Sequence, residues 1–115
     1  MKKKRPEALE GRTYSRRSGC GKIYVTVNRD KEGTPFEVFL HIGKAGGCAA
    51  AQCESIGRLI SYSFRIGGSI DDIVSELKGI RCQQNTDDQI LSCAWAVAEV
   101  LELEKAPSNL GGKEY

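Results

Sequence analysis

The fold is decided by residues 36–64, FEVFLHIGKAGGCAAAQCESIGRLISYSF, because the spacing of apolar residues changes within this stretch. Apolar residues occupy every second position from Phe36 to Ile42, which predicts a strand with one buried face and a second face that is half covered at most. Along residues 48–65 the apolar residues recur at steps of three or four, which predicts an amphipathic helix. Its apolar stripe consists of Ala49, Cys53, Ile56, Ile60 and Phe64.

Two further strands are expected upstream of this stretch. Residues 23–27, IYVTV, are β-branched and aromatic and predict a strand, and residues 12–18 predict a weaker one. The segments between the three strands are rich in Gly, Asp and Pro and have the lengths of hairpin turns. The sheet is therefore expected to be antiparallel.

Two further helices are expected downstream. Ser69 is a good N-cap for a second helix that closes near Gly79, and a third helix is expected to begin at Asp88. Its inward positions are Ile90, Ala94, Val97, Val100 and Leu101. The predicted fold class is α+β: a three-stranded antiparallel sheet followed by three helices packed on one face.

The length of 115 residues fits a single domain, and 40% hydrophobic with 28% charged residues is typical of a soluble globular protein. We expect a disordered basic tail over residues 1–10, a domain over residues 11–104 and a flexible C-terminal tail over residues 105–115. Residues 1–17 carry seven Lys and Arg against two Glu, a net charge of +5, which leaves −3 for the rest of the chain. The basic start is followed by Pro and Glu without an apolar segment, so we expect a cytoplasmic protein that makes no contact with a membrane.

Four of the five cysteines lie at predicted turns or helix starts: Cys20, Cys48, Cys82 and Cys93. In a reducing compartment an odd number of cysteines favours free thiols or metal binding over disulfides. Four thiolates around one ion suit a structural zinc, so these four residues are the predicted zinc ligands. No pair has the C-x-x-C spacing of a zinc ribbon, and Cys53 has the spacing of a core residue.

Other sites have a functional and a structural interpretation. The basic residues Lys2 to Arg5, with Arg12, Arg16 and Arg17, either bind nucleic acid or form a solvated tail. The turn GKAGGC at residues 43–48 either holds a phosphate at a helix start or uses glycine for close packing of helix on sheet, and we favour packing.

Enzymatic chemistry has little support in the residues. Cys48, at a helix start, is a candidate redox thiol, and the one histidine, His41, would have to act as its base. No aromatic platform for stacking bases stands out, because Tyr24 and Phe39 could equally be core residues. We expect no autonomous active site.

Five segments of the chain, in order, resemble the TSCPD domain: GRTYSRRSGCGKIYVTVN, TPFEVFLHIGKAGGCAAA, ESIGRLISYSFRIG, ELKGIRC and LSCAWAVAEVL. That domain is similar to the C-terminal region of vitamin B12-dependent ribonucleotide reductases and also occurs as a small stand-alone protein. The resemblance runs from about Arg5 to Leu103. The four predicted zinc ligands fall in the family's GCG, GGC, GIRC and SC motifs.

The resemblance implies an accessory or regulatory role in deoxyribonucleotide synthesis, beside a large reductase subunit that uses adenosylcobalamin. The implied partners are that subunit and a nucleotide effector or nucleic acid, and adenosylcobalamin would be met only through the subunit. The chain departs from the family's Ser-Cys-Pro-Asp motif, since Ala94 and Trp95 follow Cys93. The missing aspartate removes a carboxylate that could orient a metal ligand by a hydrogen bond, or that could contact the reductase.

Overall fold

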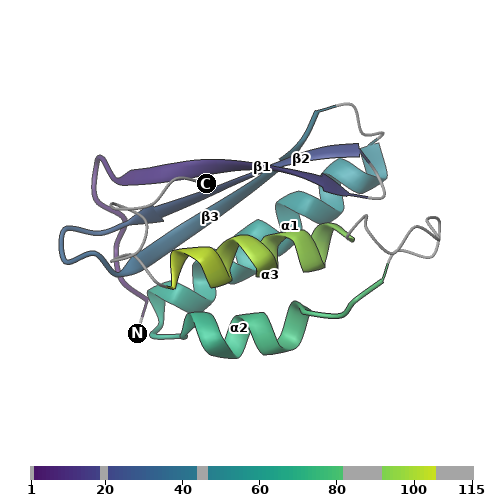
Figure 1. Ribbon diagram of the computed structural model, residues 1–115. Coiled ribbons are helices and arrows are strands. Elements are labelled where there is room, and N and C mark those ends of the chain that lie inside the picture. The colour runs from purple at the N-terminus through teal and green to yellow at the C-terminus, as the bar shows by residue number, and fades with distance from the viewer. Residues whose placement is uncertain (1, 19–20, 44–46, 82–91, 106–115) are drawn as a thin grey trace.

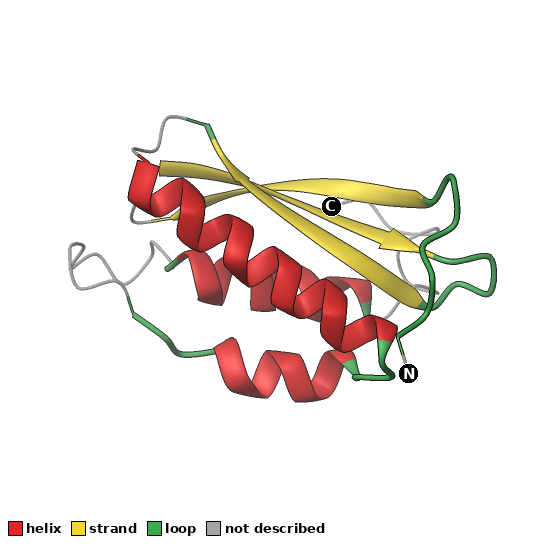
Figure 2. Ribbon diagram, turned by 180° about the vertical axis from the view of Figure 1, so that it is seen from behind, coloured by secondary structure: helices red, strands yellow, loops and turns green. Residues whose placement is uncertain are grey.

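The computed structural model of the protein describes residues 2–18, 21–43, 47–81 and 92–105. Three strands, β1 (Glu10–Ser18), β2 (Gly21–Arg29) and β3 (Pro35–Ile42), form an antiparallel sheet in the order β1-β2-β3. The helices α1 (Gly47–Arg65), α2 (Ile70–Leu77) and α3 (Cys93–Glu104) follow. They lie on one side of the sheet, and α2 packs against α3 (Figures 1 and 2). The predicted α+β fold is confirmed.

The core lies between the sheet and the helices. The alternating pattern buries one face of β2 and β3, while α1 contributes its predicted apolar stripe and α3 packs across the sheet. The strands supply Ile23, Val25, Val27, Val38, Leu40 and Ile42, and the helices supply Cys53, Ile60, Phe64, Ile73, Val74, Ala96, Val97, Ala98, Val100 and Leu101. Cys53 is a core residue, as its spacing predicts, with 1% of its surface exposed.

Helix α1 closes the outer edge of β3. The Ser61 Oγ accepts a hydrogen bond from the Val38 N–H (2.9 Å) and donates one to the Val38 carbonyl (3.1 Å). One turn earlier, a Cβ added at Gly57 would lie 3.0 Å from the Val38 oxygen, so glycine permits this close approach. The Val38 groups that face away from β2, in the middle of this edge, are therefore satisfied by a helix instead of a fourth strand.

The third helix begins at Cys93, so the predicted start at Asp88 is wrong. Ser92 has extended backbone angles and caps α3, since its Oγ accepts a hydrogen bond from the Trp95 N–H (3.0 Å). The same hydroxyl donates to the Ile80 carbonyl and so ties α3 to the chain leaving α2. Asp88 and Ile90 lie outside the described residues. The second helix has the predicted cap, because the Ser69 Oγ accepts from the Asp72 N–H (3.1 Å).

The N-terminal segment crosses the end of α1 without regular secondary structure. The Lys3 N–H donates to the Arg65 carbonyl (2.9 Å), and the Arg65 Nε donates back to the Lys3 carbonyl (2.9 Å). Disorder of residues 1–10 in solution stays a prediction, as does the flexible C-terminal tail, of which residues 106–115 lie outside the described part. Within the described ranges, no helix has the length and apolar character needed to span a bilayer.

Candidate functional site

The described residues next to the predicted zinc ligands gather at one end of the molecule. The end of β1, the start of β2 and the first turns of α1 and α3 all lie there (Figures 1 and 2). Cys48 is exposed in the first turn of α1, and Cys93 is half-buried at the start of α3. The Cys93 thiol lies 3.7 Å from the Ser18 Oγ, which brings α3 to the β1 residue two positions before Cys20.

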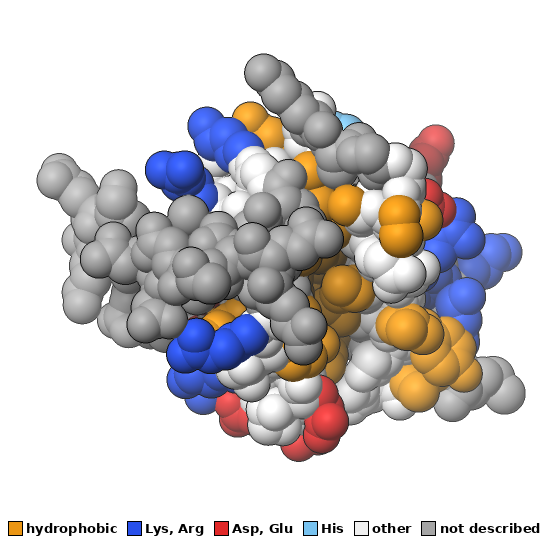
Figure 3. Space-filling model, turned by 90° about the vertical axis from the view of Figure 1, so that its right-hand side faces the viewer, with side chains coloured by type: hydrophobic (Ala, Val, Ile, Leu, Met, Phe, Trp, Pro, Cys, Tyr) orange, Lys and Arg blue, Asp and Glu red, His pale blue; other side chains and the backbone are white. Residues whose placement is uncertain are grey.

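Cys20 and Cys82 lie outside the described residues, so the four-thiolate site stays a prediction. Within the described ranges no three His, Cys, Asp or Glu residues are grouped to hold a metal. Figure 3, which looks onto this end, shows hydrophobic side chains between groups of Lys and Arg. The two described thiols thus lie at an end that also carries cationic groups.

The departure from the family motif falls at a capping position of α3. With Ser92 as N-cap, Trp95 is the third helical residue, where a carboxylate would accept a hydrogen bond from the N-cap N–H. In this chain Trp95 packs against the core instead. The family's aspartate position is therefore the capping-box position of α3, and in this chain the Ser92 hydroxyl caps the helix.

Glycine in the turn after β3 is not explained by close packing. A Cβ added at Gly43 would meet one atom, of Tyr24, at 3.9 Å, and one at Gly47 would meet nothing within 4 Å. The packing interpretation is wrong for these two residues, and residues 44–46 lie outside the described part. The glycine that packs on the sheet is Gly57, within α1.

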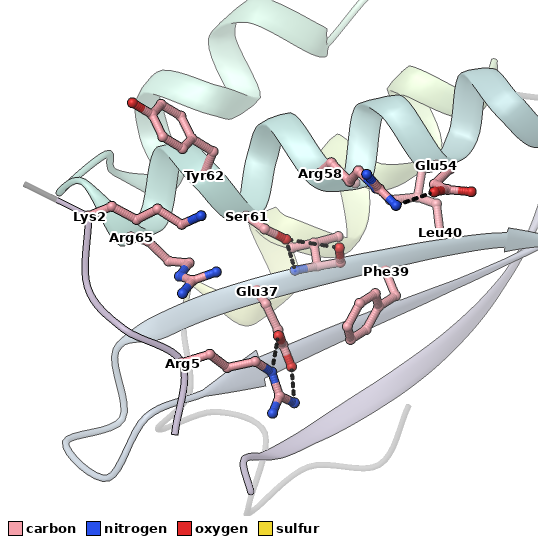
Figure 4. A pocket seen from close by; sticks show the side chains of 12 residues that line it. Lys2, Arg5, Glu37, Phe39, Leu40, Glu54, Arg58, Ser61, Tyr62 and Arg65 are labelled. Carbon is pink, nitrogen blue, oxygen red and sulfur yellow. Dashed lines mark hydrogen bonds and ion pairs between the residues drawn. The ribbon is translucent and has the colours of Figure 1, made fainter. Parts of the chain in front are cut away.

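A groove of about 480 Å³ lies beside β3, between the strand edge, α1 and the N-terminal segment (Figure 4). Its floor is Val38, Leu40 and Gly57, and Ser61 lies within it. Charged and aromatic residues surround this floor: Lys2, Arg5, Glu37, Phe39, Glu54, Arg58, Tyr62 and Arg65. Four cations face two carboxylates, so the rim has a net charge of +2.

Glu37 is buried in the rim, with 4% of its surface exposed. The Arg5 guanidinium donates two hydrogen bonds to its carboxylate (2.9 and 3.0 Å), and the Asn28 side-chain amide donates a third (2.6 Å). Burial alone would raise the pKa of Glu37, but these hydrogen bonds and the charges of Arg5 and Arg65 outweigh it and lower the pKa below its ordinary value. The carboxylate is therefore held ionised. Alternation along β3 did not reveal this pair, because Arg5 comes from a distant part of the chain.

The other rim cations have weaker partners. Arg58 pairs with Glu54 one turn away on α1 (2.7 Å), and both side chains are largely exposed. The Lys2 ammonium lies 6.0 Å from the centre of the Tyr62 ring, and the Arg65 guanidinium lies 5.1 Å from that of Phe36. Cation–π contacts leave the positive charge uncompensated. The groove is thus suited to a partner that carries negative charge.

An exposed apolar stripe continues from the groove along α1. Leu59 and Tyr62 of α1 and Ile66, the residue that follows it, are 70%, 50% and 48% exposed. They lie on one side because they are three or four residues apart and the Ile66 N–H still donates to the Tyr62 carbonyl (3.1 Å). Large apolar side chains grouped on a surface often mark a protein-binding site. The sequence shows these residues, but the stripe becomes visible only once the buried face of α1 is known.

The basic residues near the N-terminus are partly paired. Arg5 pairs with Glu37, and Arg16 pairs with Glu99 of α3 (2.8 Å). Arg12 and Arg17 are exposed. The predicted nucleic-acid interaction of this region therefore depends on fewer free charges than the sequence indicates. His41, the one candidate base for Cys48, lies against Tyr24 instead, with 6.4 Å between the ring centres.

The comparisons with known proteins identify one family. The sequence model of the TSCPD domain matches residues 1–105, which covers the sheet, all three helices and the N-terminal segment. No curated protein and no solved structure matches the chain. The match includes the four predicted zinc ligands and the residues that line the groove beside β3. The chain therefore belongs to the TSCPD domain family.

Proposed function

We propose that the protein is an accessory domain that binds the catalytic subunit of an adenosylcobalamin-dependent ribonucleotide reductase. The observation that carries this proposal is family membership over residues 1–105, since the TSCPD domain is a family found with ribonucleotide reductases. Adenosylcobalamin would supply radical chemistry in that subunit. The role of this chain would be binding, which agrees with the expectation of no autonomous active site.

The surface proposed for this contact consists of the exposed residues Leu59, Tyr62 and Ile66 together with the groove beside β3, and we call it the α1 surface. Leu59 and Ile66 are exposed without a described partner, while the cations Lys2, Arg58 and Arg65 line the groove. A complementary partner would present apolar side chains flanked by carboxylates. A few central apolar anchors usually carry most of the binding free energy of such an interface.

The direct experiment measures binding of the full chain to a purified catalytic subunit by isothermal titration calorimetry. Truncating two apolar anchors in the variant Leu59→Ala/Ile66→Ala is expected to weaken binding about tenfold or more, since each 1.4 kcal/mol is about a factor of ten. The matched control is Glu76→Ala, an exposed residue of α2, which should bind as wild type does. Absence of binding by the wild-type chain would contradict the accessory role, and equal binding by the double variant would exclude the α1 surface.

We also propose that Cys20, Cys48, Cys82 and Cys93 hold a structural zinc. The support is that β1, β2, α1 and α3 have their ends nearest to Cys20, Cys48 and Cys93 at the same end of the molecule. A zinc at this end would connect the sheet to two helices. Structural zinc in small peptides carries apparent binding free energies of roughly 10–16 kcal/mol, so metal removal should cost much of the stability.

Elemental analysis of the purified protein tests the zinc proposal, with about one zinc expected per chain. The variants Cys48→Ala and Cys93→Ala should lose the metal, whereas Cys53→Ala, a core residue outside the predicted ligand set, should keep it. Wild-type protein that is folded and free of zinc, or equal zinc content in all three variants, would refute the proposal.

A further inference from the structure

The sheet has one face that no described helix covers. The helices pack on the face that carries Ile23, Val25 and Val27 (Figures 1 and 2). The alternate residues of each strand therefore point to the opposite, open face. These residues are Thr13, Ser15 and Arg17 of β1, Lys22, Tyr24 and Thr26 of β2, and Phe39 and His41 of β3.

Rings from two neighbouring strands meet at the middle of this face. Tyr24 and His41 are paired across the strands, and their rings are tilted by 31° with centres 6.4 Å apart. Phe39 pairs with Thr26 and so lies diagonal to Tyr24, at a separation that aromatic side chains can bridge. Phe39 is 53% exposed, and the sequence-based view that it could equally be a core residue is wrong.

The same face carries unbalanced positive charge. Arg17 and Lys22 are directly opposite each other in the β1–β2 register, both are exposed, and neither makes an ion pair with a described carboxylate. Like charges at paired positions repel, so an anion between them would be stabilising. The carboxylate on this face, Glu37, is already neutralised by Arg5. The Lys22 ammonium also lies 5.9 Å from the centre of the Tyr24 ring, next to the aromatic group.

We propose that this open face binds single-stranded nucleic acid. Bases would stack on Phe39 and Tyr24, phosphates would lie at Arg17 and Lys22, and the hydroxyls of Thr13 and Thr26, which are 2.8 Å apart, would contact the sugar or base edges. Aromatic side chains on a sheet beside cationic groups are the arrangement by which proteins hold unpaired strands, because every base has a face that can stack. This site borders the groove beside β3 at Phe39, which lines both, but it does not include Leu59 or Ile66 and does not depend on the reductase contact.

Fluorescence anisotropy of the full chain with fluorescein-labelled oligo(dT) and oligo(U) of about 12 nucleotides tests the proposal. With two phosphate contacts, the affinity should fall about sevenfold between 50 and 200 mM salt, from the single-strand slope of about −0.7 per contact. Phe39→Ala should weaken binding between about fivefold and about a hundredfold, as loss of one stacked base does, while Phe39→Tyr should preserve it. Since Phe39 is half exposed, both variants should melt as wild type does.

Two comparisons separate this site from the alternatives. Leu59→Ala, on the α1 surface, should leave nucleic-acid binding unchanged, and deletion of residues 2–4 should retain the Phe39 dependence. Binding that is lost on that deletion and unaffected by Phe39→Ala would place the interaction in the basic tail and overturn the proposal. No binding of either oligonucleotide in 50 mM salt would also overturn it, and would leave the open face as a surface for a protein.

Discussion

Ser61→Ala is predicted to loosen α1 from the edge of β3. The substitution removes the hydroxyl that accepts from the Val38 N–H at 2.9 Å and donates to the Val38 carbonyl at 3.1 Å. A net intramolecular hydrogen bond contributes about 0.5–1.5 kcal/mol, so the two together stabilise the fold by about 1–3 kcal/mol. Alanine has a better helix propensity than serine, which stabilises the fold by about 0.5 kcal/mol and offsets part of this loss. The expected loss in the free energy of unfolding is about 0.5–2.5 kcal/mol.

The matched control is Ser55→Ala on the same helix. Among the described residues, the Ser55 hydroxyl donates to the Ala51 carbonyl within α1 alone (2.9 Å), so this variant should be neutral or slightly stabilised. Urea unfolding followed by circular dichroism gives both free energies, and hydrogen exchange should show faster exchange of the Val38 amide in Ser61→Ala alone. If Ser61→Ala is as stable as Ser55→Ala, the hydroxyl does not hold the helix on the strand edge, and the reasoning is refuted.

Three further predictions concern buried or crowded positions. The pKa of Glu37 is lowered in the folded state, so the ionised carboxylate stabilises the fold fully above its unfolded pKa of about 4.3, and this stabilisation is lost as the pH falls through the folded pKa. In Glu37→Gln the melting temperature should therefore depend less on pH on the acid side. Burial and a hydrogen bond to Glu104 raise the pKa of Tyr14. The protonated Tyr14 side chain therefore stabilises the fold fully below about pH 10, and this stabilisation is lost as the pH rises through the folded-state pKa. Tyr14→Phe should remove that alkaline loss and cost about 1 kcal/mol at neutral pH, measured by urea unfolding. A Cβ at Gly11 would lie 2.3 Å from the Val27 carbonyl oxygen, so Gly11→Ala should destabilise the fold by about 1–3 kcal/mol, and an unchanged melting temperature would contradict the β1–β2 geometry.

The strands and the first two helices could be predicted from the sequence because periodicity and capping are local signals. The period of two along residues 36–42 and the stripe from Cys53 to Phe64 both appear in the structure as expected. The start of α3 could not be chosen in this way, since Asp88 and Ser92 are equally suitable caps by residue type. The contact of Ser92 with Ile80, a tertiary interaction, marks Ser92 as the N-cap in the structure.

The surfaces were harder to predict than the core. Glu37 is buried by a salt bridge with Arg5, which is 32 residues away, and no local pattern indicates such a pair. Phe39 and Tyr24 were ambiguous because alternation gives the two faces of a strand without saying which one the helices cover. The thiols are an intermediate case: the helix-start positions of Cys48 and Cys93 could be predicted, and the convergence of all four thiols on one metal remains a prediction.

The contact between Ser61 and Val38 also limits how copies of this chain can polymerise. Growth of a continuous β-fibril needs two free edges in every copy, one at each side of the sheet. In the described part of the chain, β1 is at one edge and is open, whereas the middle of the other edge is occupied by α1. Edge-to-edge pairing would therefore end at a two-fold dimer through β1, and the chain would need to detach a helix before it could form a filament.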